Sequence, residues 1–451
     1  MAEDEVTLAF RFGYGLPLPK GAPTDAGGML AALGAADAMA KRYSGLGFAA
    51  ALPLLQDVQA TRKLLKADAA NKPLYRKAIL ASDRGALGNM RATVARALDA
   101  PDGFRERLVR FWGDHFSTSA KSRQDLLLPG TLIEDAIRPH VTGRFADMLK
   151  AVTLHPGMLV YLDQVLSVGP TSRAGVKGNK GLNENLAREL MELHTLGVNA
   201  SYGQDDVRQM AELLTGLAVD FDKGFVFEPR RAEPGAETVL GIAYEGDGTA
   251  PILQALDDLA MRPEAADHIA RQLAVHFVSD QPDADLVAHI RAAYLETGGD
   301  LMALYGALLN HPAAWGQSPA KVRQPFDFVV ASLRALGMTG DAVFQLNDKQ
   351  FQRFVTQPME AMGQPLRGPP GPDGWPEDAA AWINSGGLAA RINWAMDMPV
   401  QLTAELPVPL DLAKRALGAR AGKQLLWAVE RAETIREGVG LVLASADFNR
   451  R

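Results

Sequence analysis

The chain has 451 residues, 47% of them hydrophobic, so it can bury a large core and form two or three compact lobes. Its formal net charge of −6 argues against a general nucleic-acid binder, which usually carries a basic excess. It contains no cysteine, which excludes disulfides, thiolate metal sites and a cysteine nucleophile. A metal would need histidine, carboxylate or carbonyl ligands.

The first residues of the chain indicate in which cellular compartment the protein is expected. Glu3, Asp4 and Glu5 occupy positions where a secretory signal has positive charge. No uninterrupted apolar run approaches the roughly 20 residues that span a bilayer. We expect a soluble protein, cytoplasmic as written and periplasmic or secreted if a leader was removed, without a transmembrane segment.

Helical spacing dominates the first half, so we expect an all-α, multi-helical globular protein. A central helix should begin after Asn183, a good N-cap, and stop at Gly197. The other helices predicted between Gly, Pro or Asp breaks span residues 28–42, 49–67, 72–98, 104–115, 132–138, 144–154, 157–165 and 205–216.

The pattern changes at residues 217–244, where aromatic and β-branched residues mixed with Gly and Pro predict a small β-ribbon. The string GQPLRGPPGPDGWP at 363–376 is too rich in Pro and Gly to be anything but a loop. We therefore divide the chain into an N-terminal helical lobe (1–216), the ribbon (217–246) and a C-terminal helical lobe (247–451). Its later helices are predicted at 267–275, 284–294, 301–309, 326–336, 379–383, 385–396, 410–417 and 423–429.

The central helix, LNENLARELMELHTLG, carries a polar row. Asn185, Arg188, Glu189 and Glu192 fall at i, i+3, i+4 and i+7 and share one face. The two glutamates can bind a divalent cation or act as an acid/base pair. Alternatively, Arg188 pairs with the glutamates four residues before and after it, and the row braces a helix packing. His194 should point away from this row.

Asp114 and His115 end the aromatic-rich helix 104–115. His115 is a candidate ligand or general base; in the alternative, its ring donates to a backbone carbonyl at the helix C-terminus. The candidate catalytic residues are Glu189, Glu192, Arg188 and His115, and the candidate metal ligands are Glu189, Glu192, Asp114 and His115. A divalent metal is the only cofactor that the residues suggest.

Two further segments are suited to ligands. The glycine-rich loop 167–181 carries Arg173, Lys177 and Lys180 just before Asn183 and Asn185, a combination that can hold an anion at a helix start; the alternative is a solvated loop. Trp375 and Trp382 can stack on a sugar, or they can pin the Pro/Gly-rich loop to the body.

Several strings make the chain similar to a bacterial family of unknown function, DUF1800. The resemblance covers nearly the whole chain and implies a large, mostly helical bacterial protein, often exported and often encoded near a sulfatase-like partner, with no settled activity. The strings are FRFGYG, FWGDHFSTS, IRPHVTGRFADML, HPGMLVYLD, NENLARELMELHTLG, DVRQMAELLTG, FVSDQP, GGDL, FDFVVASLRALG and GQPL.

The chain departs from the family pattern at three positions. Ala232 and Arg262 stand where the family has histidines, and Leu217 stands where it commonly has tryptophan. If those histidines serve a family reaction, this member has lost it; the alternative is neutral drift.

The residues favour an enzyme, metal-dependent or carboxylate-based, that acts on an anionic or carbohydrate-type substrate. The competing hypothesis is a noncatalytic scaffold or accessory subunit whose polar helix is structural.

Overall fold

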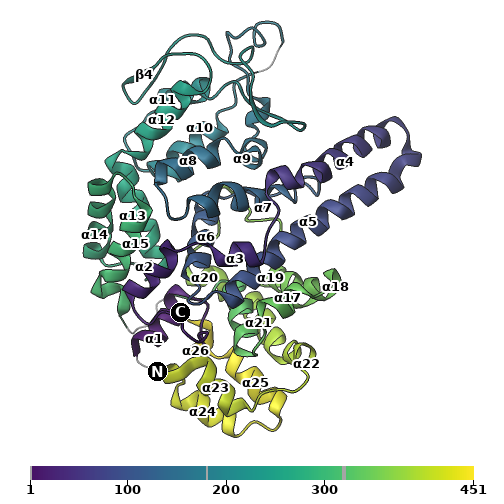
Figure 1. Cartoon of the computed structure of the whole chain (residues 1–451), viewed down its shortest axis with the longest axis vertical. Helices are drawn as coiled ribbons and strands as arrows, with labels where there is room; N and C mark the ends of the chain where they lie inside the picture. The colour runs from purple at the N-terminus through teal and green to yellow at the C-terminus, as the bar shows by residue number, and fades with distance from the viewer. Residues whose placement is uncertain (1–2, 179–180, 317–320) are drawn as a thin grey trace.

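The structure is a computed structural model that describes residues 3–178, 181–316 and 321–451. It is elongated: the short strands lie at one end, helices α21–α26 lie at the other, and one helical hairpin projects from the side (Figure 1). Helices form nearly all of its regular structure, with two small antiparallel hairpins near the middle of the chain. The predicted fold class is therefore confirmed.

The elements follow one another with short connections. The first part of the chain contains α1 Glu3–Thr7, η1 Leu8–Phe12, α2 Ala26–Gly34, α3 Ala38–Arg42, α4 Phe48–Ala67, η2 Ala69–Asn71, α5 Lys72–Asp99, α6 Phe104–His115, α7 Leu128–Leu132, η3 Ile133–Ile137, η4 Arg138–His140, α8 Phe145–Thr153, α9 Pro156–Tyr161, η5 Gln164–Leu166, α10 Asn185–Glu189, η6 Leu190–Thr195 and α11 Gln204–Leu213.

The hairpins and the later helices complete the fold. They are β1 Leu217–Asp220, β2 Gly224–Phe227, β3 Glu237–Val239, β4 Ile242–Tyr244, α12 Ala250–Ala260, α13 Pro263–Phe277, α14 Ala284–Thr297, α15 Leu301–Asn310, η7 Pro312–Trp315, α16 Pro325–Ala335, α17 Gly340–Phe344, α18 Asp348–Phe351, η8 Gln352–Thr356, α19 Gln357–Ala361, α20 Ala379–Trp382, α21 Ser385–Asp397, α22 Pro399–Leu402, α23 Pro409–Leu417, η9 Gly418–Arg420, α24 Lys423–Glu430, α25 Ile435–Ala444 and α26 Ala446–Asn449.

Helix α6 shows how local sequence sets an element. Gly103 precedes it with a φ of +77°, and the predicted bounds 104–115 match the observed ones. Its apolar side chains, including Phe104, Leu108 and Trp112, are buried in the largest core cluster. The helix is therefore packed inside the protein, where Glu106 and Arg107 form buried ion pairs and Arg110 and Asp114 line a cavity.

The central helix differs from the prediction in its geometry. It is α-helical only over Asn185–Glu189 and continues as a π-helix over Leu190–Thr195. The wider turn is visible in the bond from the Leu196 N–H to the Met191 carbonyl at 2.9 Å. Such π-helical turns are rare and occur often at functional sites.

Several boundaries also differ. The helix predicted over 28–42 is two helices, α2 and α3, because Asp37 caps a new start by accepting the Ala40 N–H. The ribbon is two separate hairpins, β1–β2 and β3–β4. The helices at 3–12, 340–361 and 435–449 were not predicted from the sequence.

The N-terminal segment joins two large apolar cores. Leu8 and Phe12 lie in a core formed mainly by residues up to 315, whereas Phe10 and Tyr14 lie in a core formed mainly by residues 326–448. One short segment thus places alternate side chains in the two cores. The division at residues 216 and 247 stays a prediction.

None of the helices in the described ranges combines the length and the apolar character needed to cross a membrane.

Candidate functional site

The predicted polar row is organised around Arg188. Its guanidinium contacts carboxylate oxygens of Glu184 and Glu192, each at 3.3 Å, and the side-chain oxygen of Gln204 at 3.1 Å. The Gln204 amide in turn donates to Glu184 at 2.9 Å. Arg188 therefore ties α10 to the start of α11, which is the arrangement that the structural alternative describes.

Glu189 is not part of this brace. It is half-buried, and its carboxylate has no hydrogen bond or ion pair within the described part of the chain. Burial raises the pKa of Glu189, the negative charges of Glu192 and Asp373 add to the shift, and the positive charge of Arg188 partly opposes it. Glu189 is thus the one member of the row whose charge is uncompensated by contact.

The proposed metal ligands do not form one cluster. Nowhere in the described ranges do three or more His, Asp or Glu side chains converge in a way that could hold a metal ion. Glu189 and Glu192 lie beside the Arg188 brace, whereas Asp114 accepts a hydrogen bond from the Trp375 N–H.

The amides and cations predicted to bind an anion have other surroundings. The Asn183 side chain accepts the Asn185 N–H at 2.8 Å, but Asn183 is not the N-cap that the sequence predicts: α10 begins at Asn185, and its N-cap position is Glu184, whose side chain makes no capping hydrogen bond. Arg173 and Lys177 are exposed, on a loop whose Gly169 N–H donates to the Arg231 carbonyl at 2.8 Å. Lys180 lies outside the described residues.

His115 lies in an aromatic cluster with two other histidines. Its Nε2–H donates to the backbone carbonyl of His194 at 3.0 Å, and its ring centroid lies 6.4 Å from that of His194 and 5.8 Å from that of His268. Burial lowers the pKa of His115 well below its usual value. The carbonyl partner comes from η6 and not from its own helix terminus, and the ring is held neutral.

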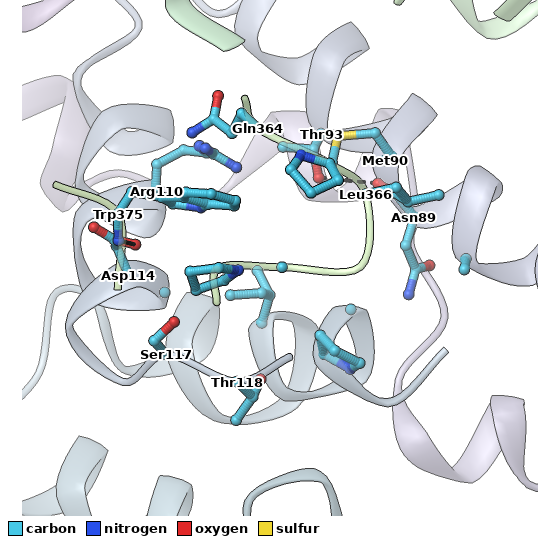
Figure 2. Close-up of a pocket in the computed structure, with 18 of the residues that line it drawn as sticks. Asn89, Met90, Thr93, Arg110, Asp114, Ser117, Thr118, Gln364, Leu366 and Trp375 are labelled. Carbon is cyan, nitrogen blue, oxygen red and sulfur yellow. Dashed lines mark hydrogen bonds between the residues drawn. The ribbon is translucent and has the colours of Figure 1, made fainter. Parts of the chain in front are cut away.

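A cavity of about 140 Å³ lies beside α6, beneath the Pro/Gly-rich loop (Figure 2). Arg110, Asp114 and Trp375 lie together at one side of it. The other polar groups that line it are Asn89 and Thr93 from α5, Ser117 and Thr118 after α6, Glu134 from η3, and Gln364 from the loop.

Arg110 supplies an unmatched positive charge to this cavity. Its guanidinium carbon lies 4.1 Å from the centroid of the Phe326 ring, in a cation–π contact. No carboxylate or carbonyl of the described chain pairs with it. A half-buried cation without a counter-ion favours an anionic group in the adjacent space.

Asp114 lies one turn after Arg110 on the same face of α6. Its Oδ1 accepts the backbone N–H of Trp375 at 2.9 Å. Burial raises the pKa of Asp114 to about 8, although the Trp375 hydrogen bond opposes the shift. At pH 7 this side chain is therefore mainly a neutral carboxylic acid that can donate a proton.

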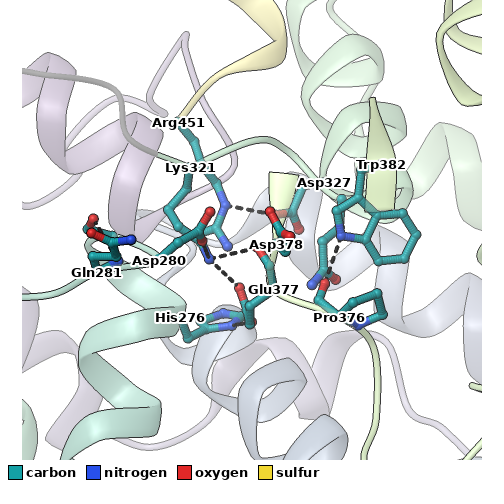
Figure 3. A network of polar contacts seen from close by, with 12 residues as sticks. His276, Asp280, Gln281, Lys321, Asp327, Pro376, Glu377, Asp378, Trp382 and Arg451 are labelled. Atoms are coloured by element: carbon teal, nitrogen blue, oxygen red, sulfur yellow. Dashed lines mark hydrogen bonds and ion pairs between the residues drawn. The ribbon is translucent and has the colours of Figure 1, made fainter. Parts of the chain in front are cut away.

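A buried ionic network anchors the loop on its far side (Figure 3). Glu377, two residues after Trp375, contacts His276 Nδ1 at 2.5 Å and Lys321 Nζ at 2.8 Å. Burial alone would raise the pKa of Glu377, but His276, Lys321 and Arg451 outweigh it and lower the pKa to about 2. The anionic Glu377 thus fixes the end of the loop that carries Trp375.

The two tryptophans of the loop have different positions. Trp382 is buried, and its Nε1–H donates to the Pro376 carbonyl at 2.8 Å, so it pins the loop. Trp375 lines the cavity, with its ring centroid 6.0 Å from that of Trp382.

Sequence reasoning missed Arg110. The signal that could have found it is the four-residue spacing to Asp114, which places both on one face of a helix.

A family model described as "Protein of unknown function (DUF1800)" matches residues 27–450. No curated protein and no solved structure matches the chain.

Proposed function

Since the chain belongs to the DUF1800 family over nearly its whole length, and the family description assigns no activity, we propose a function from the site itself. The protein is a carboxylate-based enzyme that binds a small anionic substrate in the cavity beneath the loop. Arg110 pairs with the anion, water attacks the ester and supplies the hydroxyl that replaces the leaving group, and Asp114 donates a proton to the leaving oxygen and regains one from the attacking water.

The unmatched charge of Arg110 is the observation that carries this proposal. Of the more deeply buried arginines, Arg107 pairs with Asp327 and Arg96 with Glu134, whereas others, such as Arg334, donate to backbone carbonyls. Arg110 has neither kind of partner in the described ranges. A cavity of about 140 Å³ is close in size to the roughly 150 Å³ cavity that holds benzene. A phosphate or sulfate ester of one small ring fits this space, with part of the ring in the open mouth.

The raised pKa of Asp114 supports the catalytic part of the proposal. A general acid works best when its pKa lies near the working pH, since it then holds its proton and still releases it in the transition state. Ser117, Thr118 and Gln364 supply hydrogen-bonding groups around the same space.

Anion binding by Arg110 can be tested by calorimetry with orthophosphate, sulfate, a phosphorylated monosaccharide and a sulfated monosaccharide. Arg110→Gln should weaken binding at least about tenfold, because a charge-assisted hydrogen bond contributes about 1.5–3 kcal/mol. The matched control is Arg173→Gln, on the exposed loop. Loss of binding in the Arg173 variant alone would move the site to that loop.

Proton donation by Asp114 can be tested with chromogenic phosphate, sulfate and glycoside esters. Asp114→Asn retains the acceptor for the Trp375 N–H but cannot transfer a proton. We expect kcat to fall by about 10²–10⁴ with KM nearly unchanged. In the unmodified protein, kcat should fall as the pH rises through about 8. Equal turnover by the variant would contradict the role of Asp114.

A second candidate function is cation binding at Glu189 and Glu192, favoured because no ion pair or hydrogen bond joins Glu189 to another side chain of the described ranges. Elemental analysis of protein purified without chelators or a histidine tag tests it. A stoichiometric metal that disappears in the double variant Glu189→Gln, Glu192→Gln would support a metal-dependent enzyme, with substrate or water completing the coordination.

The remaining alternative is a noncatalytic scaffold or accessory subunit. It is favoured if no anion and no metal binds, and if the double variant is folded but less stable. The sulfatase-like partner that the resemblance implies is an extension of the enzyme proposal: binding of the sulfated monosaccharide in the cavity would give the two proteins a common substrate class.

A further inference from the structure

The long helices α4 and α5 form an antiparallel hairpin whose end projects from the body (Figure 1). We call residues 57–84, around the connection between the two helices, the arm. The Gln124 amide donates to the hydroxyl of Tyr75, in the first turn of α5, at 3.0 Å, and nearer the base of the arm Arg123 pairs with Asp83. On the side that faces the body, Val58, Arg62, Lys63 and Lys66 of α4 line a pocket together with Gln124, Asp125 and Phe221, and the end of the arm, around the connection, projects beyond it (Figure 1).

The arm is basic in an acidic protein. It contains seven Lys or Arg and three Asp, so its net charge is +4, whereas the remaining residues carry −10 of the total of −6. Arg84 pairs with Asp348 at 3.3 Å. The other six basic side chains of the arm are exposed and have no ion pair or hydrogen bond in the described ranges: Arg62, Lys63, Lys66, Lys72, Arg76 and Lys77.

Large apolar side chains are exposed among these cations. Leu64 is 47% exposed near the end of α4, and Leu74 is 50% exposed near the start of α5. Both lie within about one turn of the connection formed by Asp68 and η2. Exposed leucines next to lysines at the end of a projection are typical of a segment that enters the interface of a bilayer.

We propose that the end of the arm docks on an anionic lipid bilayer. The six cations contact the phospholipid headgroups, and Leu64 and Leu74 enter the boundary between headgroups and acyl chains. Nucleic acid would satisfy the cations but leave the leucines exposed to water. An acidic bilayer satisfies both kinds of side chain, and the docking is peripheral because the arm inserts only side chains.

The length of the arm explains how an acidic protein approaches an acidic surface. From Gln59 to Ala67, α4 rises by about 12 Å at 1.5 Å per residue. The Debye length at physiological ionic strength is about 8 Å. The negative charge of the body is therefore largely screened from a surface that the end of the arm touches.

Sedimentation of the full chain with vesicles tests the proposal. We expect binding to vesicles of equal parts phosphatidylcholine and phosphatidylglycerol, no binding to pure phosphatidylcholine, and loss of binding at high salt. The triple variant Lys63→Glu, Lys66→Glu, Lys72→Glu should weaken binding at least about tenfold. The matched control is Lys20→Glu, Lys223→Glu, Lys423→Glu, which makes the same charge change at exposed lysines elsewhere and should bind as the unmodified chain does.

The leucines have a separate readout. Leu64→Ser with Leu74→Ser should weaken vesicle binding and leave the melting temperature unchanged, since both side chains are exposed. Equal loss of binding in the arm variant and the matched control would overturn the proposal, because net charge alone would then explain it. Failure of the unmodified chain to bind anionic vesicles while it binds polyglutamate would overturn it in favour of an acidic protein partner.

Discussion

Arg188 decides how the polar row of the central helix is interpreted. Its guanidinium is 39% exposed and contacts two glutamates that are also partly exposed. Ion pairs of this kind, four residues apart on a helix, contribute a few tenths of a kcal/mol each. The row therefore stabilises the joint between α10 and α11 only modestly, and Glu189 takes no part in it.

This difference between the two glutamates is testable. Glu192→Gln removes one contact of Arg188 and should lower the free energy of unfolding by about 0.3–0.5 kcal/mol at low salt. Glu189→Gln should not lower it, because the raised pKa of Glu189 shows that its charge is penalised in the folded protein. Urea denaturation at neutral pH measures both. A larger loss for Glu189→Gln would place that residue in the brace.

At the scale of elements, the Pro/Gly-rich loop is fitted closely to α6. Gly374 has a φ of +79°, in the left-handed region, and a Cβ there would lie 2.8 Å from the Asp114 carbonyl oxygen. Only glycine allows the loop this approach, which delivers the Trp375 N–H to Asp114.

We therefore expect Gly374→Ala to displace the loop, to weaken anion binding in the cavity, and to lower the free energy of unfolding by about 1–3 kcal/mol. Calorimetry and urea denaturation measure the two effects. The control is Gly371→Ala in the same loop, whose nearest contact under 3 Å is the end of the Asp373 side chain. Equal effects of the two variants would show that the close approach at Gly374 is unimportant.

Three helices meet at His115 of α6, His194 of η6 and His268 of α13, of which His194 is buried and the other two are partly buried. Burial lowers the pKa of each, that of His194 to about 3, below the unfolded value of 6.5. The folded protein thus keeps the rings neutral where the unfolded chain takes up protons. Their contribution to stability is complete above pH 6.5 and is lost progressively as the pH falls below it.

His194 offers the clearest test, since neither ring nitrogen has a hydrogen-bond partner in the described structure. The His194→Phe variant should lose less stability between pH 6.5 and pH 4 than the unmodified chain, with a slope reduced by up to about 1.4 kcal/mol per pH unit. Denaturation at a series of pH values measures this slope. An unchanged slope would mean that other groups cause the acid sensitivity.

Sequence patterns predict elements better than they predict the site. The bounds of α6 are marked by Gly103 and an amphipathic run, so they were predicted correctly. Helix α25, IREGVGLVLA, was missed because its two glycines oppose a helix that tertiary packing nevertheless stabilises. In the site, Arg110 and Asp114 are four residues apart, but Trp375 reaches Asp114 across 261 residues, a pairing that no local spacing reveals.

At the scale of the whole molecule, the N-terminal segment makes the two cores depend on each other. Phe12 is fully buried, with its ring centroid 5.9 Å from that of Phe277 and 5.4 Å from that of Trp315. Two residues earlier, Phe10 packs in the other core. Loss of packing in one core therefore also weakens the packing of the N-terminal segment in the other core.

We expect Phe12→Ala to lower the free energy of unfolding by about 3–5 kcal/mol and to leave one transition for the whole chain. Calorimetry measures both. The control is Phe344→Ala, whose side chain is 41% exposed and should cost much less. Two separate transitions, of which only one moves, would show that the cores unfold independently.

The packing of the same segment is delayed during synthesis, because one of its partners is made much later. The ring of Tyr14 packs against that of Phe326, with the centroids 5.8 Å apart, although Phe326 is made 312 residues later. At about 5–20 residues per second, the nascent chain carries one uncovered face of this segment for roughly 15–60 s. During that interval the exposed aromatic side chains are a binding site for a chaperone, and the second core cannot close over Tyr14 until Phe326 has been made.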